Sequence, residues 1–146
     1  MRLRELLEGE THLAFEAARE LRPHLTSASE FAERVDRVQR PEGYRLVGAF
    51  LEHNAGGPAI AFTGFRVLHN LAWGHVLYID DLGTLPTARG RGAGRALLDW
   101  CATEAARLGC DQLHLDSGFG PDRADAHRLY LNAGYRLSSH HFARGT

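Results

Sequence analysis

The sequence predicts an α+β fold: a mixed, mostly antiparallel sheet with a central parallel strand pair and flanking helices. Two helical patterns come first, three strand patterns joined by short loops follow, and the rest alternates strand, helix, strand, helix, strand. Strands joined by short loops form an antiparallel meander, whereas strands joined through a helix run parallel. We expect one domain over residues 1–146, because this length suits a single core.

Composition restricts the classes of function. The 17 basic and 18 acidic side chains leave a formal net charge of −1, so no overall field recruits nucleic acid or an anionic membrane. No apolar run approaches the ~20 residues of a membrane span, and residues 1–5 are too charged for a signal peptide. Cys101 and Cys110 are expected to be buried hydrophobes rather than a disulfide. We therefore expect a cytoplasmic protein that binds neither nucleic acid nor membrane.

Two helices are predicted before the meander. Apolar side chains recur at helical spacing over residues 11–21, and a proline follows. Ser27 and Glu30 form a capping-box pattern that opens a second helix, in which Val35 and Val38 are expected to share the apolar face.

Two more helices are predicted in the second half. One covers residues 93–108 and ends at Gly109; the other covers residues 123–132, with Asp122 as its N-cap, and ends at Gly134. The predicted strands are residues 2–6, 44–51, 60–68, 75–84, 112–116 and 135–142, with a turn at residues 53–57.

A loop rich in glycine and arginine joins the strand 75–84 to the helix 93–108. Glycine early in a helix costs roughly 1 kcal/mol relative to alanine, so repeated glycines indicate a need for bare backbone. Unpaired N–H groups at a helix N-terminus, with the positive end of the dipole, bind phosphate, and arginines add attraction. The alternative interpretation is a glycine-rich turn that binds nothing. The loop residues are Arg89, Gly90, Arg91, Gly92, Ala93, Gly94 and Arg95.

Two common phosphate-binding patterns do not fit this loop. A Walker loop needs a lysine, and the sequence contains none. The dinucleotide pattern G-x-G-x-x-G/A fails, because its sixth position is Arg95 or Leu97. The pattern that fits is Arg-x-x-Gly-x-Gly over residues 89–94. It resembles the acetyl-CoA pyrophosphate loop of the Gcn5-related N-acetyltransferase (GNAT) family.

A second motif carries the same resemblance. Residues 126–135 read Ala-His-Arg-Leu-Tyr-Leu-Asn-Ala-Gly-Tyr, which is similar to the family's Ala-x-x-x-Tyr-x-x-x-Gly-Phe/Tyr helix. The closing segment is also similar to aminoalkylphosphonate acetyltransferases. The resemblance implies the GNAT fold, in which residues 75–146 form the acetyl-CoA-binding core and residues 1–74 face the acceptor.

The resemblance also implies roles for particular residues. Backbone groups of Leu82 and Thr84 are expected to hold the pantetheine arm of acetyl-CoA, and residues 89–95 its pyrophosphate. Tyr130 is expected to bind next to the leaving sulfur and to act as the acid, because a phenol with a pKa of ~10 is protonated at pH 7. The alternative for Tyr130 is a core tyrosine. Arg123 stands where many members have asparagine, and we expect it to reach a phosphate instead.

Asp80 and Asp81 are adjacent carboxylates on an otherwise apolar strand. Because side chains alternate, they are expected to point to opposite faces, with Asp80 on the face of Tyr78, Leu82 and Thr84. The pair is similar to an acidic pair in polyamine acetyltransferases of the family, which implies a catalytic role toward the amine for both. Asp80 is the expected base, directly or through water. The alternative is one carboxylate exposed at a strand end and the other bonded to backbone.

The sequence thus predicts an acetyl-CoA-dependent N-acetyltransferase that moves acetyl to a primary amine of a small molecule by direct attack. No histidine pair has metal-ligand spacing on a predicted helix, so we expect no metal. His114 and Asp116 are interpreted as a structural pair on one strand face. Two other functions stay open: a non-catalytic acyl-CoA sensor, and an acetyltransferase for peptide or protein N-termini. The short last strand leaves a sheet edge for a second subunit, which predicts a homodimer.

Overall fold

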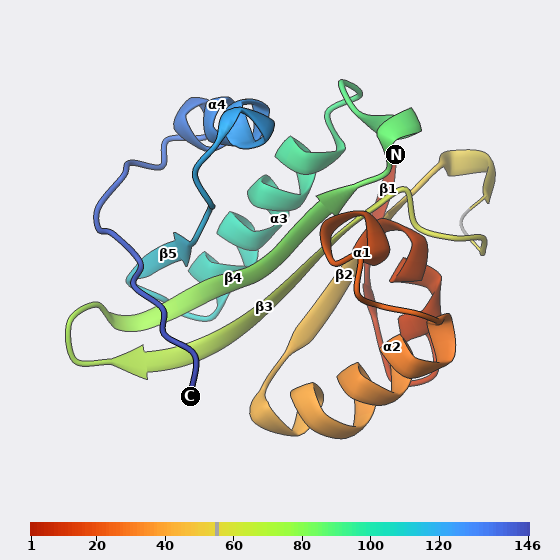
Figure 1. Ribbon diagram of the computed structural model, residues 1–146, viewed down its shortest axis with the longest axis horizontal. Helices are drawn as coiled ribbons and strands as arrows, with labels where there is room; N and C mark the ends of the chain where they lie inside the picture. Colours follow the sequence, from red (N-terminus) through yellow and green to blue (C-terminus); the bar gives the residue numbers. More distant parts are fainter. Residues whose placement is uncertain (55) are drawn as a thin grey trace.

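The computed structural model describes residues 1–54 and 56–146. Its five strands lie in the order β1-β2-β3-β4-β5, antiparallel throughout except for β4 and β5, which run parallel (Figure 1). The predicted meander and the parallel pair are therefore confirmed. Ala55 of the predicted 53–57 turn lies outside the described residues. The strands are β1 (Arg2–Leu6), β2 (Arg45–Phe50), β3 (Ala61–Asn70), β4 (Gly74–Thr84) and β5 (Gln112–Leu115).

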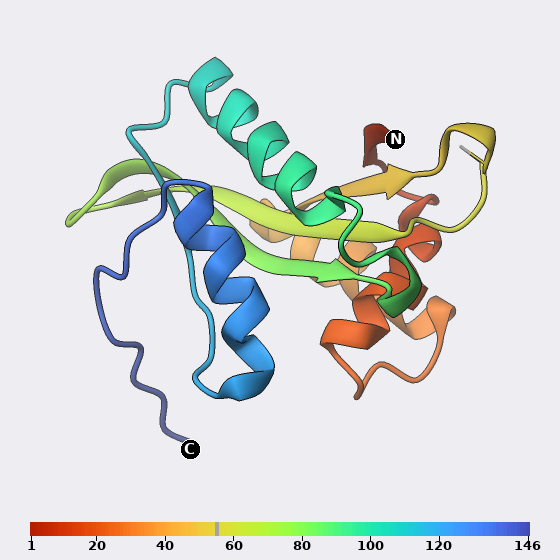
Figure 2. The ribbon, with the colours of Figure 1, turned by 90° about the horizontal axis from the view of Figure 1, so that it is seen from above.

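Helices cover both faces of the sheet (Figure 2). On one face lie α1 (Phe15–Leu21), which a 3-10 turn precedes, and α2 (Ala28–Arg34). On the other face lies α3 (Ala93–Arg107), with α4 (Ala124–Asn132) packed beside it. Each face has its own apolar core, and the two cores share the sheet between them. Within the described residues, no helix has the length and apolar character needed to cross a membrane.

The second helix begins as predicted but ends earlier. The Ser27 hydroxyl accepts a hydrogen bond from the Glu30 N–H at 3.1 Å, which confirms the cap. After α2 the chain continues as a π turn over Val35–Gln39 and a 3-10 turn over Arg40–Glu42. The wider π turn rotates Val38 away from the apolar face, and its side chain is 56% exposed. The prediction that Val38 packs in the core was wrong.

The predicted strand over residues 135–142 was also wrong. After α4 the chain turns at Gly134, where φ is +88°, and forms neither helix nor strand through Thr146 (Figures 1 and 2). The alternation of apolar residues is present, but in the described chain no ladder of backbone hydrogen bonds joins this segment to the edge strand β5. Leu137 and Phe142 are therefore 78% and 91% exposed.

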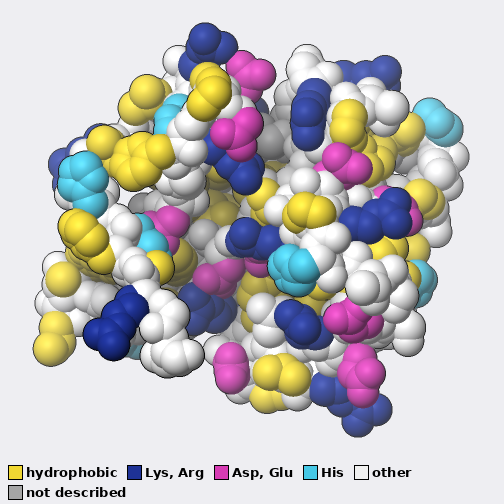
Figure 3. Space-filling model, in the orientation of Figure 1, with side chains coloured by type: hydrophobic (Ala, Val, Ile, Leu, Met, Phe, Trp, Pro, Cys, Tyr) yellow, Lys and Arg dark blue, Asp and Glu magenta, His cyan; other side chains and the backbone are white. Residues whose placement is uncertain are grey.

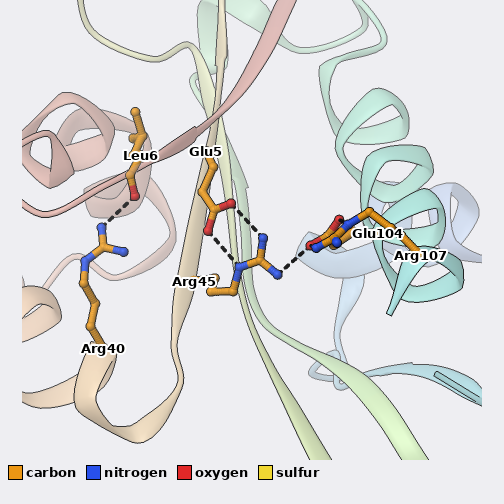
Figure 4. Close-up of polar contacts among 6 residues, drawn as sticks. All are labelled: Glu5, Leu6, Arg40, Arg45, Glu104 and Arg107. Atoms are coloured by element: carbon orange, nitrogen blue, oxygen red, sulfur yellow. Dashed lines mark hydrogen bonds and ion pairs between the residues drawn. The ribbon is translucent and has the colours of Figure 1, made fainter. Parts of the chain in front are cut away.

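A chain of ion pairs ties the first two strands to α3 (Figure 4). Arg45 on β2 donates two hydrogen bonds of 2.7 Å to Glu5 on β1 and one of 2.6 Å to Glu104 on α3. Arg107 donates two more to Glu104. Glu104 is only 7% exposed, and the hydrogen bonds from Arg107 and Arg45 lower its pKa to about 2. This carboxylate is thus buried without being left unpaired.

Candidate active site

The glycine-rich loop leaves the N-terminus of α3 open. Gly90 and Gly92 have φ angles of +73° and +82°, in the left-handed region that glycine adopts without strain. Gly92 is the N-cap of α3, and no side chain of the described residues caps the helix there. A Cβ atom at either glycine would meet nothing within 4 Å. Arg89 and Arg91 flank Gly90 and are exposed. The backbone N–H groups of the first turn are therefore accessible to an anion.

The later residues of the loop motif make contacts within the protein. A Cβ atom at Gly94 would lie 3.0 Å from the Leu129 side chain, so this glycine lets α3 approach α4 closely. Arg95 bonds to Asp99 at 2.9 Å and to the Asn132 carbonyl at 3.2 Å, which also joins the two helices. The preceding Ala93 is buried in the core below α3. Gly94 and Arg95 thus have structural roles that need no ligand.

Beside this loop, β4 and β5 separate. They pair only from Val76–Gln112 to Ile79–Leu115, although β4 continues to Thr84. In the part of the chain that the structure describes, the backbone of residues 80–84 faces no strand on the β5 side. Leu82 and Thr84, the two predicted pantetheine-binding residues, lie in this unpaired part. Their backbone groups are free to bind an extended ligand that takes the place of a strand.

Tyr130 lies on α4 and is half-buried. Burial raises the pKa of its phenol, and the charge of Arg123 opposes this only in part. The Tyr130 ring meets the Tyr135 ring edge-on, with 6.2 Å between centroids. Arg123 follows Asp122 in a 3-10 turn and pairs with it at 3.4 Å. The N-cap of α4 is Arg123, without a side-chain cap bond, so the prediction of Asp122 was wrong.

A β-bulge changes the geometry predicted for the two adjacent aspartates. Gly64 of β3 lies opposite Asp81 and Phe65 lies opposite Ile79, so Asp80 is an extra residue in β4. The two residues of such a bulge point to the same side of the sheet. Both aspartates line one pocket on the face covered by α1 and α2. The expectation that they point to opposite faces was therefore wrong.

The same bulge reverses the expected position of Leu82. This side chain packs against the core below α3, on the face opposite Asp80. The period of two holds on each side of the bulge, but the extra residue shifts its phase.

Each aspartate is held by an arginine. Asp80 accepts hydrogen bonds of 2.8 and 2.5 Å from Nε and Nη2 of Arg66 on β3, which makes a bidentate ion pair. Asp81 accepts one of 2.9 Å from Nε of Arg22, the residue that follows α1. Nη2 of Arg22 also donates to the Asp80 carbonyl at 3.2 Å, which fixes the backbone of the bulge.

The second oxygen of Asp81 is held by Tyr44. The phenol, 3% exposed, donates a hydrogen bond of 2.9 Å to Oδ2 of Asp81. Burial, and then the charge of Asp81, raise the pKa of Tyr44 well above its usual value. A Cβ atom at Gly64 would lie 1.6 Å from the Tyr44 oxygen, so only glycine at position 64 leaves room for this contact.

Together these side chains line a pocket of about 320 Å³. Acidic and basic side chains gather around a hollow in the middle of this face (Figure 3). The pocket opens beside the bulge, at the point where β4 enters its unpaired part. The lining residues are Arg22, Gln39, Glu42, Tyr44, Arg66, Asp80 and Asp81.

Sequence reasoning found the two aspartates but missed their partners. Arg66 carried a signal, since a charged side chain on an apolar strand needs an opposite charge nearby. Gly64 carried another, because glycine inside a strand marks a bulge or a close approach of another group. Arg22 and Gln39 lie where helical segments end, and nothing in the sequence placed them near the strand.

His114 and Asp116, on and just after β5, make hydrogen bonds and ring contacts within the protein. His114 bonds to Gln112 at 2.9 Å and stacks on Trp73, with ring centroids 4.0 Å apart. Asp116 accepts a hydrogen bond of 2.5 Å from Tyr78, so His114 and Asp116 each have a structural partner of their own. Among the described residues, no group of three or more His, Cys, Asp or Glu side chains is arranged to hold a metal ion.

Comparison with known proteins identifies the family. Residues 7–135 match the family model described as "Acetyltransferase (GNAT) family". Aminoalkylphosphonate N-acetyltransferase of Salmonella typhimurium is 36% identical over 77 residues, 53% of this chain and 47% of that protein, so the match spans about half of its length. Uncharacterized N-acetyltransferase YhdJ of Bacillus subtilis is 31% identical over 126 residues, 86% of this chain and 84% of the relative.

The solved structures show the same fold. The crystal structure of ribosomal-protein-alanine N-acetyltransferase from Brucella melitensis biovar Abortus 2308 matches with a TM-score of 0.82 at 18% identity, over 100% of both chains. The resemblance carried by the two sequence motifs is thus confirmed, and the chain belongs to the GNAT family of acetyltransferases.

Proposed function

We propose that this protein transfers acetyl from acetyl-CoA to a primary amine of a small molecule by direct attack. The observation that carries the proposal is the order of three features along one strand and the loop after it. A polar pocket at the bulge of β4 comes first, the unpaired backbone of residues 82–84 follows, and the open N-terminus of α3 comes last. An acceptor, an extended thioester arm and a pyrophosphate fit these three features in that order.

The bond changes define what the residues must do. The amine nitrogen forms a bond to the thioester carbon, and the bond between that carbon and sulfur breaks. The amine loses a proton and the departing thiolate gains one. We assign the proton transfer to the thiolate to Tyr130. Burial raises the pKa of its phenol, so the hydroxyl is protonated at neutral pH.

The two aspartates take different roles in this proposal. Asp81 has both oxygens bonded, to Arg22 and to Tyr44, and its side chain is 14% exposed. Among the described residues, the Asp80 side chain is bonded to Arg66 alone, and it is 22% exposed. We therefore assign the acceptor amine and its proton to Asp80, directly or through water. Asp81 acts as the group that holds the pocket and the bulge in shape.

The binding roles divide in the same way. We assign the pyrophosphate to Arg89, Arg91 and the first N–H groups of α3, and the pantetheine arm to the backbone of Leu82 and Thr84. We assign to Arg123, at the N-terminus of α4, a further positive charge for a phosphate of acetyl-CoA. No metal enters this mechanism.

A small acceptor agrees with the size of the pocket, which lies at the lower end of the range for small-molecule sites. A relative named for aminoalkylphosphonates also supports a small amine as the acceptor. The alternatives are a peptide N-terminus as acceptor, and an acyl-CoA sensor without turnover.

The test is a panel of amines and short peptides incubated with acetyl-CoA, with thiol release and product mass as readouts. Acetylation of small amines in preference to peptides supports the proposal. Acetylation of peptides alone identifies an N-terminal acetyltransferase instead. Acetyl-CoA binding measured by calorimetry, without release of thiol for any acceptor, identifies a sensor.

A further inference from the structure

The pocket beside the bulge offers unused hydrogen-bond donors and acceptors next to one another. Arg66 uses Nε and Nη2 for Asp80, and Arg22 uses Nε and Nη2 for Asp81 and the Asp80 carbonyl. Within the described residues, Nη1 of each arginine has no hydrogen-bond partner. The two arginine side chains are 41% and 47% exposed, so these donors are accessible from the pocket.

Asp80 also keeps the capacity to accept more hydrogen bonds. A carboxylate has about four acceptor sites, and Arg66 occupies one on each oxygen. An ammonium group can thus bond to Asp80 without displacing Arg66. The Asp80 carboxylate then lies between two cations, the guanidinium of Arg66 and the ammonium of the acceptor.

A simple alkylamine satisfies only half of this arrangement. It donates to Asp80 but brings a second positive charge close to Arg66, and it leaves the free guanidinium donors to water. An acceptor that also carries an oxyanion accepts from those donors and offsets the added charge. Guanidinium groups recognise carboxylates and phosphonates well because their N–H groups form a planar fork.

The charge of the pocket sets a limit on the acceptor. Two arginines face Asp80, Asp81 and Glu42, so the lining carries a formal charge of −1. Glu42 makes no ion pair within the described part of the chain, although its charge acts on Arg66. This excess negative charge disfavours an anion without an amine, and the two guanidiniums disfavour a diamine.

We infer that the acceptor is a zwitterion, a primary amine that carries a carboxylate or phosphonate a few bonds away, and that Arg66 is the residue that selects it. This inference rests on the proposed function, because it names the acceptor of that same site. Arg66 binds the oxyanion through Nη1 while it holds Asp80 against the ammonium, and Nη1 of Arg22 is a second donor to the oxyanion.

The experiment compares acceptors of similar length: β-alanine and 2-aminoethylphosphonate as zwitterions, propylamine as a monocation and putrescine as a dication. We expect wild type to acetylate the zwitterions with the highest kcat/KM. In Arg66→Gln, kcat/KM for the zwitterions should fall about 30-fold, mainly through KM, because a charge-assisted pair is lost. Propylamine should lose clearly less than the zwitterions, because it has no oxyanion for the guanidinium and is affected only by the weaker hold on Asp80.

Two variants serve as controls. Arg66→Lys keeps the charge but not the fork, so its loss should be intermediate. Arg19→Gln removes an exposed arginine that pairs with Glu16 on α1, and it should leave all four acceptors unchanged. A merely structural role of Arg66 predicts equal losses for all acceptors, and that result would overturn the inference. Wild-type kcat/KM for propylamine equal to that for β-alanine would overturn it too.

A failure of the proposed function looks different. If no amine causes release of thiol, calorimetry of 2-aminoethylphosphonate and propylamine decides. Binding of the phosphonate alone, lost in Arg66→Gln, supports the zwitterion site without acetyl transfer. Binding of neither compound, or of both equally, overturns the inference.

Discussion

At the scale of single residues, two tyrosines in edge-on contact, Tyr130 and Tyr135, allow a catalytic role to be distinguished from a packing role. Tyr130 is half-buried, and burial raises the pKa of its phenol. The Tyr135 oxygen is buried and has no hydrogen-bond partner among the described residues. A change to phenylalanine at either position removes one hydroxyl, but only the hydroxyl of Tyr130 is assigned to the reaction.

We predict that Tyr130→Phe lowers kcat by ~10²-fold while the affinity for acetyl-CoA stays near that of wild type, because only the proton transfer to the thiolate is lost. Steady-state kinetics and calorimetry measure the two quantities. Tyr135→Phe is the matched control. It should leave kcat unchanged and stability equal or slightly higher, since an unpaired buried hydroxyl is removed. Equal turnover of Tyr130→Phe and wild type would reduce Tyr130 to a packing residue.

At the scale of elements, the loop before α3 is the part whose assigned ligand is most readily tested. Gly92 is the N-cap, its φ is positive, and the space around it is open. Asparagine and aspartate are of nearly equal size, both cap helices well, and both tolerate this backbone conformation better than most residues. They differ in charge.

We predict that Gly92→Asp weakens acetyl-CoA binding at least 10-fold more than Gly92→Asn, because a carboxylate competes with the pyrophosphate for the same N–H groups. Calorimetric titration with acetyl-CoA measures both affinities. Gly94→Asp is a less informative variant for this test. Its Cβ atom would press on the Leu129 side chain whether or not a ligand binds. If both Gly92 variants bind like wild type, the pyrophosphate lies elsewhere.

Most elements were predictable from the sequence because their signals are local. The apolar period and Gly109 placed the end of α3 within one residue of its observed end, and the Ser27 cap marked the start of α2. The bulge in β4 was not predictable by alternation, because it depends on how two strands pair. The segment after Gly134 has a strand-like pattern but does not pair with the edge strand β5, and a pattern alone cannot show whether pairing forms. The acidic pair was found, but its arginine partners come from segments distant in sequence.

At the scale of the whole molecule, the Glu104 cluster links β1, β2 and α3 across one core. Its folded pKa of about 2 lies below the ordinary value of 4.5. The ionised form therefore stabilises the folded state above pH 4.5, and this contribution is lost as pH falls from 4.5 toward 2. The shift corresponds to at most about 3 kcal/mol.

We predict that Glu104→Gln lowers the free energy of unfolding at pH 7, and that its difference from wild type shrinks steadily between pH 4.5 and 2.5. Urea denaturation across this range gives the difference. Glu16→Gln removes an exposed pair on α1 and should change stability by less than about 1 kcal/mol at pH 7. A difference for Glu104→Gln that does not vary with pH would mean that the carboxylate contributes packing rather than charge.

The edge of the sheet leads to a prediction about assembly. β5 pairs with β4 alone among the described strands, and Leu137 and Phe142 are exposed beyond it. Unpaired edges and exposed apolar side chains favour association, so we expect a homodimer. Light scattering should give twice the chain mass of 16.2 kDa. A mass of one chain at assay concentration would exclude it.

The arginine pairs on Asp80 and Asp81 have a consequence for how this protein responds to alkali. Guanidinium groups keep their proton beyond pH 12, and the chain has no lysine to lose its own. Between pH 7 and 10, a free alkylamine with a pKa of ~10.4 stays mostly ammonium, but its nucleophilic fraction rises by roughly several hundredfold. The Arg66 guanidinium, whose pKa the hydrogen bond to Asp80 raises further, stays charged through that interval. The alkaline limb of its rate profile therefore reports the ionisation of the acceptor.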